Sequence, residues 1–250
     1  MKDSTLKTHG EKNMKDIVTS YEQAKAALYA NVDEKYKAFN EPIVNCDYPT
    51  LGVRTPIIKK LAKSVPLSSR ADVLDGFFAD ASSAKIYDAV LFAGCVAARK
   101  GDYAATREYL KKLIPMFGSW AHTDCVVPCL DWTDVKTVLE DFSYLLDCDG
   151  QYEKRFYIIY LMNYCLCDEY IDGALDTLAH RVKFGDYYVD MAAAWMIAEA
   201  LVKQFDKAFP LIERAVFPKF VHNKAIQKAR ESYRIPQDVK ERLKQLRIKN

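Results

Sequence analysis

The sequence predicts an all-α fold, an α-solenoid of HEAT-like helical repeats with a concave basic groove. Apolar residues recur every three or four positions from about residue 14 onward, and no stretch alternates with a period of two for long enough to form a sheet. The predicted helices come in pairs about every 30–40 residues, which is typical of helical repeat arrays. Only nine glycines and nine prolines punctuate the 250 residues, too few for the many turns of a β-sandwich or a Rossmann fold. A compact helical bundle is the alternative.

A first helix is predicted over 16–29 by apolar residues three or four positions apart: Ile17, Tyr21, Ala24 and Leu28. A polar, irregular stretch follows over 40–51. Thr55 and Pro56 then open a second helix, with the threonine as N-cap and the proline at the first helical position, where no N–H is needed. The apolar face of this helix leaves three lysines outside it: Lys59, Lys60 and Lys63.

Beyond Pro66 the predicted helices follow one another in pairs, separated by short breaks that contain glycine or proline. They are expected over 69–80 and 84–99, 102–116 and 119–130, 133–147 and 151–166, 169–182 and 186–203, and 205–216 and 221–233, with 236–247 last. Residues 16–250 are therefore predicted to form a single helical-repeat domain. The polar segment 1–15 has no apolar face and is expected to be a flexible N-terminal arm.

Charge is unevenly distributed along the chain. The net charge is +2, but residues 214–250 contain eleven Lys and Arg against three Asp and Glu, so the remainder is net acidic. A basic segment of this kind suits a polyanionic partner, or it forms a solvated basic tail. Because successive helices of a solenoid build one extended concave surface, side chains distant in sequence are expected to share a groove.

Export and membrane signals are not recognisable in the sequence. No apolar run approaches the roughly 18 residues of a membrane helix, and the polar N-terminus does not resemble a signal peptide. The seven cysteines are an odd number, which is typical of reduced thiols in the cytosol. The sequence thus predicts a cytoplasmic protein without a membrane partner.

The cysteines also raise the question of a metal site. His122, Cys125 and Cys129 stand three and four residues apart, and Cys165 and Cys167 form a second group, but no C-x2-C pair occurs. Structural zinc sites rarely use such spacings on a continuous helix, and cysteine is a common small filler of helical cores. Glycine-rich phosphate loops, G-x-S-x-G and H-E-x-x-H are also missing from the sequence. Neither a metal nor a cofactor is expected.

Three groups of residues are candidates for chemistry. Trp120 and Asp124 stand four residues apart, so both lie on one helix face. They form either a buried structural pair or a site in which the acid lies beside the face of the indole. Arg155 lies near the start of an otherwise apolar helix. Its guanidinium either forms a salt bridge with a neighbouring repeat or binds a phosphate. Trp195 follows a run of small residues and is either a core residue or an exposed aromatic wall.

A family resemblance emerges from these residues taken in order. The segment Tyr48-x3-Gly52-Val53-Arg54-x-Pro56, continuing into Lys59-Lys60-Leu61-Ala62-Lys63, resembles the N-terminal signature of the AlkD-like DNA alkylation repair proteins. Trp120-x3-Asp124, the helix at Arg155 and Trp195 follow in the order and spacing of that family. The segment 222–228 is similar to the closing repeat of its shorter bacterial members. The resemblance covers roughly 40–246 and implies a HEAT-like solenoid acting as a DNA glycosylase.

The resemblance also implies roles for individual residues. Asp124 matches the catalytic carboxylate, Trp120 and Trp195 match two aromatic cleft walls, and Arg155 matches a phosphate-contacting arginine. Candidates for neutralising the DNA backbone are Arg155, Arg54, Lys59, Lys60, Lys63, Lys224 and Lys228, with Lys219, Arg230 and Arg234 beside them. The helix before Trp195 carries Asp190 and Met191 where the family usually has basic residues, which predicts a weaker local grip on DNA and puts catalytic competence in question.

The expected function is that of a monofunctional glycosylase that excises cationic N3- or N7-alkylated purines from duplex DNA. Its partner would be double-stranded DNA containing alkylated bases, and it would work as a monomer in the bacterial cytosol or nucleoid. Such a base leaves as a neutral molecule, so one carboxylate that stabilises the electron-poor sugar and orients water is sufficient. Two alternatives stay open: a non-catalytic HEAT-repeat binder of damaged or branched DNA, and a protein-interaction module that binds no nucleic acid.

Overall fold

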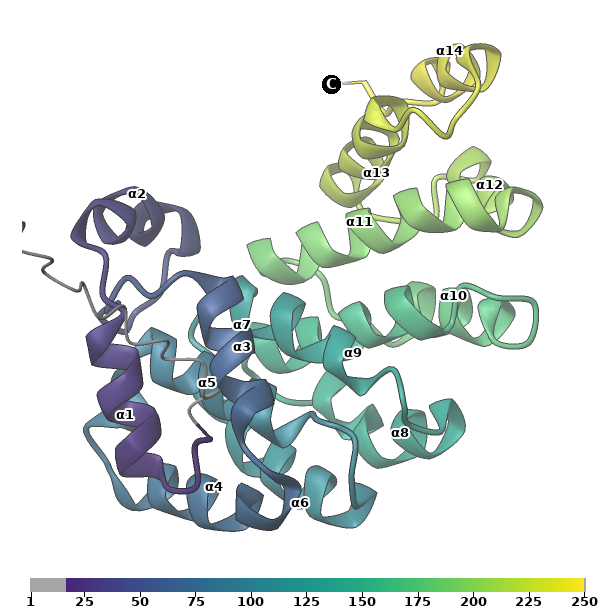
Figure 1. Cartoon of the computed structure of the whole chain (residues 1–250). Helices are drawn as coiled ribbons and strands as arrows, with labels where there is room; N and C mark the ends of the chain where they lie inside the picture. The colour runs from purple at the N-terminus through teal and green to yellow at the C-terminus, as the bar shows by residue number, and fades with distance from the viewer. Residues whose placement is uncertain (1–16, 250) are drawn as a thin grey trace, which may run out of the picture.

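Fourteen α-helices and five short 3-10 helices make up the part of the chain that the computed structural model describes, residues 17–249. No strand occurs within that range, and Figure 1 shows the helices stacked in successive layers from the N-terminus to the C-terminus. The predicted α-solenoid of helical repeats is confirmed. The predicted arm 1–15 lies outside the described residues. Within the described residues, no helix combines the length and the apolar character needed to span a membrane.

The first half of the chain contains the α-helices α1 (Tyr21–Ala30), α2 (Glu34–Val44), α3 (Thr55–Ser64), α4 (Arg70–Ala79), α5 (Tyr87–Ala97), α6 (Tyr103–Leu113) and α7 (Trp120–Val126). The second half contains α8 (Val135–Phe142), α9 (Gln151–Tyr164), α10 (Ile171–His180), α11 (Tyr187–Lys203), α12 (Phe205–Glu213), α13 (Lys219–Glu231) and α14 (Gln237–Gln245). The 3-10 helices are η1 (Leu67–Ser69), η2 (Ser83–Lys85), η3 (Ile114–Met116), η4 (Val127–Leu130) and η5 (Ser143–Leu146).

The odd-numbered helices from α3 to α13 form one continuous row. In this inner row α3 packs on α5, α5 on α7, α7 on α9, α9 on α11, and α11 on α13. Even-numbered helices flank it: α4 and α6 pack on α5, α12 packs on α11 and α10, and α14 packs on α13 (Figure 1). This two-layer arrangement is the usual one for a helical solenoid, in which each repeat buries its apolar face against its neighbours.

The core is centred on α5 and α9. Every residue of α5 is buried, which its composition of small and apolar side chains permits on all faces of the helix. Gly94 allows the closest approach, because a Cβ atom there would lie 2.6 Å from Cγ2 of Val126 on α7. The buried Asp88 carboxylate accepts hydrogen bonds from the backbone N–H groups of Leu51 (2.6 Å) and Val53 (2.8 Å), and burial raises its pKa. This contact fixes the loop that leads into α3.

Helix α2 is not predicted by the sequence pattern, which indicates an irregular stretch over 40–51. The side chain of Asp33 caps α2 by accepting a hydrogen bond from the N–H of Tyr36 (3.0 Å), and Asn45 ends it in the left-handed conformation with φ 42°. Pro42 lies inside the last turns. The capping residues at both ends thus outweigh the missing donor of one proline.

Several predicted helices switch to a 3-10 turn before they end. The helices expected over 102–116 and 119–130 end as α-helices at Leu113 and Val126 and continue as η3 and η4. Pro115 and Pro128 lie in these 3-10 turns, and neither has the N–H that an α-helical hydrogen bond requires. The two prolines therefore shorten α6 and α7 relative to the periodicity.

Candidate functional site

The carboxylate of Asp124 on α7 is held by the guanidinium of Arg155 on α9. Nε of Arg155 donates to Oδ1 of Asp124 (2.9 Å) and Nη2 donates to Oδ2 (2.7 Å), a bidentate ion pair whose side chains are 12% exposed for Asp124 and 6% for Arg155. Thr123 Oγ1 also donates to Oδ1 (2.9 Å), and Arg155 Nη1 donates to the carbonyl of Tyr188 (2.8 Å). One guanidinium therefore joins α7, α9 and α11.

The hydrogen bonds of Arg155 bear on its two predicted roles, pairing with a neighbouring repeat and binding a phosphate. The predicted pairing with a neighbouring repeat is present, since Arg155 bonds residues of the helices on both sides of α9. Its Nε, Nη1 and Nη2 atoms all have protein partners, and the residue is buried. The contact with a DNA phosphate stays a prediction.

Trp120 lies one helical turn before Asp124 and contacts the end of α2. Its Nε1 donates to the carbonyl of Ile43 (3.1 Å), while Ser119 Oγ donates to the carbonyl of Val44 (2.6 Å). These two donors satisfy carbonyl groups that the end of a helix leaves without partners. The half-exposed indole and the exposed Ile43 consequently lie side by side near the ion pair.

Trp195 belongs to a partly exposed stripe on α11. Tyr188, Met191 and Trp195 are half-buried, whereas Ala192 and Ala193 between them are buried. The spacing of three and four residues puts the stripe on one face, with Trp195 roughly 10 Å along the helix axis from Tyr188. Trp195 lines an open pocket of about 300 Å³ between α11 and the end of α13. Its indole is therefore accessible from solvent rather than part of the core.

The predicted cationic residues gather at two places. A hydrogen bond with Cys95 lowers the pKa of Cys129 on η4, and the charges of Lys59 and Lys63 lower it further. These two lysines of α3 therefore lie on the side of η4. Lys228 on α13 lies with Nζ 6.0 Å from the ring centroid of Trp195.

The remaining candidates are more peripheral. Arg54 precedes α3, pairs with Asp33 (2.9 Å) and lies over the ring of Tyr36 (4.8 Å). Lys60 is exposed on α3, and Lys224 of α13 donates to Oε1 of Gln227 (3.1 Å). Cationic residues thus occur on both sides of the Asp124–Arg155 pair along the inner row, at α3 and at α13.

Asp190 does not lie on the exposed stripe of α11. It is buried, its Oδ1 accepts a hydrogen bond from the backbone N–H of Gly185 (3.0 Å), and desolvation raises its pKa. The carboxylate therefore stabilises the start of α11. Of the two positions where the resemblance implies basic residues, only Met191 lies half-exposed on the stripe.

His122 is a structural residue of the core. Its Nδ1 accepts a hydrogen bond from the N–H of Gly118 (3.2 Å), and its Nε2 donates to the carbonyl of Tyr87 (3.0 Å). Both ring nitrogens are therefore engaged, and burial lowers the pKa of the imidazole to about 4. Among residues 17–249 no group of three or more His, Cys, Asp or Glu residues is arranged to hold a metal ion.

The low pKa of His122 predicts a pH dependence of stability. The folded pKa lies below the ordinary value of 6.5, so the unfolded chain binds a proton that the folded chain excludes between pH 6.5 and about pH 4. The free energy of unfolding is expected to fall by about 3 kcal/mol across this window because of His122 alone. Urea denaturation at pH 7 and pH 4.5 measures it. His122→Gln should remove most of this slope and the exposed His180→Gln should not; equal slopes in both variants would contradict the assignment.

Two contributors to the site have no recognisable signal as single residues. The carbonyl of Tyr188 is a backbone group that any residue type at this position would supply, so the sequence does not mark it. Ile43 belongs to α2, which the sequence pattern does not predict. Its proximity to Trp120 depends on a contact between segments 77 residues apart.

The fold and this geometry define a class of protein: a helical solenoid that displays a fixed carboxylate, two accessible indoles and flanking cationic side chains along its inner row. The family of DNA alkylation repair enzymes matches residues 24–229, from α1 into the last turn of α13. The chain belongs to this family, which gives it a role in DNA alkylation repair with DNA as the substrate. Searches among curated proteins and among solved structures found no match.

Proposed function

We propose that the protein is a monofunctional DNA glycosylase that hydrolyses the N-glycosidic bond of cationic N3- or N7-alkylated purines in duplex DNA. The observation that carries this proposal is the fixed Asp124 carboxylate, held by Arg155 in the middle of the inner row with Trp120 on the same helix face. Family membership supports the repair role, and the carboxylate is the group that would stabilise positive charge on the sugar and orient water.

The leaving group needs little help from the protein. A purine alkylated at N3 or N7 carries a positive charge and departs as a neutral base, so no general acid has to protonate it. Positive charge then develops on the deoxyribose, which takes on oxocarbenium character. A carboxylate placed near the sugar stabilises that charge and orients the attacking water.

Asp124 fits this task because its orientation is set before DNA binds. Arg155 and Thr123 fix the carboxylate plane through three hydrogen bonds, and the side chain keeps 12% of its surface accessible. A preorganised charge needs no rearrangement as the transition state forms. In this proposal Arg155 acts on catalysis through Asp124, as a positioning residue.

The two indoles recognise the lesion by its charge. Aromatic faces attract cations, and both Trp120 and Trp195 are partly accessible to solvent. An alkylated purine nucleotide is cationic whereas an undamaged nucleotide is not. The indoles therefore favour the damaged nucleotide at a carboxylate that itself attracts positive charge.

DNA binding is expected to depend steeply on salt, because the flanking cationic residues bind phosphates and release counterions. Lys59→Ala, Lys63→Ala and Lys228→Ala should each weaken binding to duplex DNA and make the slope of log K against log salt shallower by about 0.9 for each phosphate that is no longer neutralised. Fluorescence anisotropy titrations at several salt concentrations measure the slope. Lys207→Ala is the control, since this lysine pairs with Asp172 on the outer helices. An unchanged slope in all three variants would remove these lysines from the interface.

The proposal is tested by incubating the protein with duplex DNA containing N7-methylguanine. Free 7-methylguanine should be released while the sugar–phosphate backbone stays intact, and an undamaged duplex of the same sequence should release no base. Retention of the methylated duplex without any release would favour the non-catalytic binder. Neither retention nor release would favour a protein-interaction module.

A further inference from the structure

Four aromatic rings form a connected ladder across three helices of the inner row. Ring centroids are 5.4 Å apart for Tyr152 and Tyr188, 5.1 Å for Tyr188 and Tyr187, and 6.2 Å for Tyr187 and Phe220. The ladder thus runs from α9 through the start of α11 to the start of α13. It passes beside the candidate site, because the carbonyl of Tyr188, the second residue of the ladder, accepts a hydrogen bond from Arg155.

The ladder passes from the interior to the surface. Tyr152 is only 9% exposed, whereas Tyr187 is 58% and Phe220 43% exposed. Asn45 at the end of α2 donates a hydrogen bond to the hydroxyl of Tyr188 (3.1 Å), which holds that middle ring. Two large adjacent rings that stay accessible are a feature of ligand-binding surfaces, because packing in the core would otherwise cover them.

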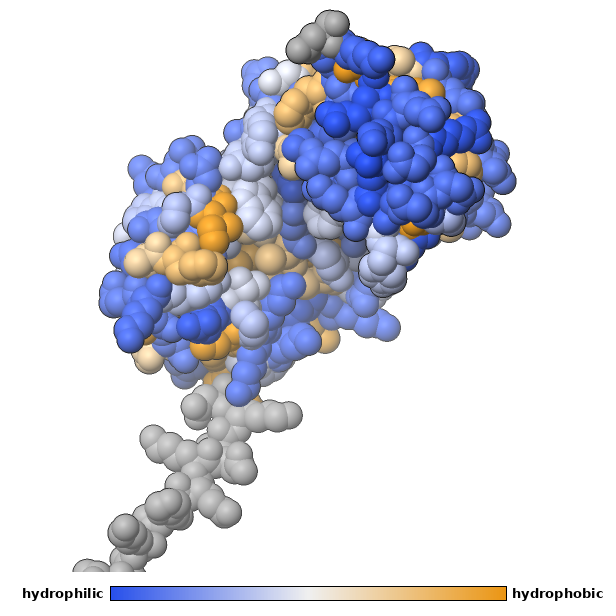
Figure 2. Space-filling view, turned by 90° about the horizontal axis from the view of Figure 1, so that it is seen from above, coloured by the Kyte–Doolittle hydropathy of each residue, from blue (hydrophilic) through white to orange (hydrophobic). Residues whose placement is uncertain are grey.

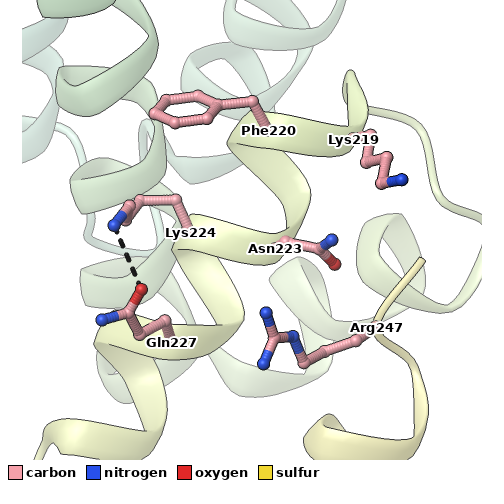
Figure 3. A pocket seen from close by; sticks show the side chains of 6 residues that line it. All are labelled: Lys219, Phe220, Asn223, Lys224, Gln227 and Arg247. Atoms are coloured by element: carbon pink, nitrogen blue, oxygen red, sulfur yellow. Dashed lines mark hydrogen bonds between the residues drawn. The ribbon is translucent and has the colours of Figure 1, made fainter. Parts of the chain in front are cut away.

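A basic pocket adjoins the outer end of the ladder. It has a volume of about 550 Å³ and is lined by Lys219, Phe220, Asn223, Lys224, Gln227 and Arg247. Figure 3 shows Phe220 and Lys224 on one side of α13, with Asn223 and Arg247 facing each other on the other side. The lining includes three cationic side chains and two amides but no carboxylate. Phosphate groups suit such a lining, whereas an apolar peptide would find few partners in it.

The two lobes beside the pocket differ in hydropathy. Seen from above, the C-terminal helices form a lobe that is predominantly hydrophilic, and a recessed strip separates it from the lobe that contains α2 (Figure 2). The α2 lobe carries hydrophobic patches, in keeping with the exposure of Phe39 and Ile43. The more hydrophilic lobe therefore lies on the side of α13, next to the exposed rings.

We propose that the exposed end of the ladder, Tyr187 and Phe220, and this pocket together bind unpaired nucleotides of single-stranded DNA. The bases stack on the two rings, and Lys224 and Arg247 bind the phosphates. This inference rests on the proposed function for DNA as the ligand and extends it to a second DNA-binding site. Aromatic platforms beside cationic side chains are the usual means of binding single strands without sequence preference.

Ring spacing favours an unpaired strand over an intact duplex. Bases in a duplex strand are stacked about 3.4 Å apart and shield one another. The rings of Tyr187 and Phe220 are 6.2 Å apart, so bases that lie on both rings must have left the duplex stack. A damaged pair that opens at the proposed catalytic site would supply such nucleotides, and the ladder passes beside that site through Tyr188.

The test compares two single-stranded oligonucleotides of equal length, one of thymidylates and one of abasic residues that offers phosphates without bases. Fluorescence anisotropy measures the affinity of the wild type, Phe220→Leu, Tyr187→Leu and the control Tyr144→Leu, whose ring is 41% exposed on η5. Phe220→Leu and Tyr187→Leu should each weaken thymidylate binding by about tenfold and leave abasic binding unchanged. Lys224→Ala should weaken both, and Tyr144→Leu neither.

Equal affinity of the wild type for both oligonucleotides would overturn the inference, as would ladder variants that bind thymidylates like the wild type. Release of 7-methylguanine from duplex DNA is measured on the same wild-type preparation. A wild type that prefers thymidylates through the ladder but releases no base would refute the glycosylase proposal alone. Base release without any preference for thymidylates would refute the ladder proposal alone.

Discussion

Asp124→Asn is expected to slow the release of 7-methylguanine from duplex DNA by at least about 100-fold, the cost typical of removing one preorganised electrostatic group. The amide has the size of the carboxylate but no negative charge, so it does not stabilise the developing charge on the sugar. Single-turnover assays with enzyme in excess measure the rate of base release. DNA affinity, measured separately by anisotropy, should change little because the flanking lysines are retained.

Asp131→Asn is the matched control for this experiment. Asp131 is an exposed carboxylate that follows η4, seven residues after Asp124, and it has no contact with Arg155 among the described hydrogen bonds and ion pairs. Its variant should release base at the wild-type rate. If Asp124→Asn also kept the wild-type rate, the catalytic role of the carboxylate would be wrong even if the protein repairs DNA.

The sequence predicts local features of this protein well because they depend on residues three or four positions apart. The shared helix face of Trp120 and Asp124 follows from helical spacing alone, and in the structure Asp124 is the acid of the ion pair while Trp120 lies one turn before it. Contacts between repeats do not follow from spacing. Arg155 lies 31 residues after Asp124, and the sequence leaves its partner open between a neighbouring repeat and a phosphate.

Local signals also compete, as α2 shows. Pro42 and the polar composition indicate a loop, whereas Asp33 and Asn45 have the residue types of a helix start and a helix end. The structure shows that the caps prevail. Because the periodicity does not indicate α2, it cannot indicate the contact between the end of α2 and Trp120 either.

The basic C-terminal segment illustrates a different limit. Counting charges predicts a cationic surface but not the face on which each charge lies. Arg242 pairs with Glu213 (2.7 Å) and lies over the ring of Phe209 (3.9 Å), and Arg234 pairs with Glu199 (2.7 Å). Arg242 thus links α14 to α12, and Arg234 links the loop after α13 to α11. Lys224 instead lines the pocket beside Phe220, and Lys228 lies over the ring of Trp195.

Arg155→Ala is expected to destabilise the fold by about 3–5 kcal/mol, the usual effect of removing one partner from a buried ion pair. It leaves the carboxylate of Asp124 without its charged partner, with Thr123 as the remaining donor, and the carbonyl of Tyr188 without its donor, at a place where the side chains of the pair are only 6% and 12% exposed. Urea denaturation at pH 7 measures the destabilisation. Arg54→Ala is the comparison, because its pair with Asp33 is 55% and 36% exposed, so its loss should destabilise the fold far less than Arg155→Ala.

A double-mutant cycle separates the ion pair from the other contacts of Arg155. Once Asp124→Ala has removed the carboxylate, a further Arg155→Ala should cost less than it does alone, because the guanidinium no longer has its charged partner. What remains is the cost of leaving the Tyr188 carbonyl without a donor. Equal costs of Arg155→Ala with and without Asp124 would show that the pair is not coupled. In that case Arg155 would stabilise the junction of α9 and α11 alone, and its role in positioning the carboxylate would have to be abandoned.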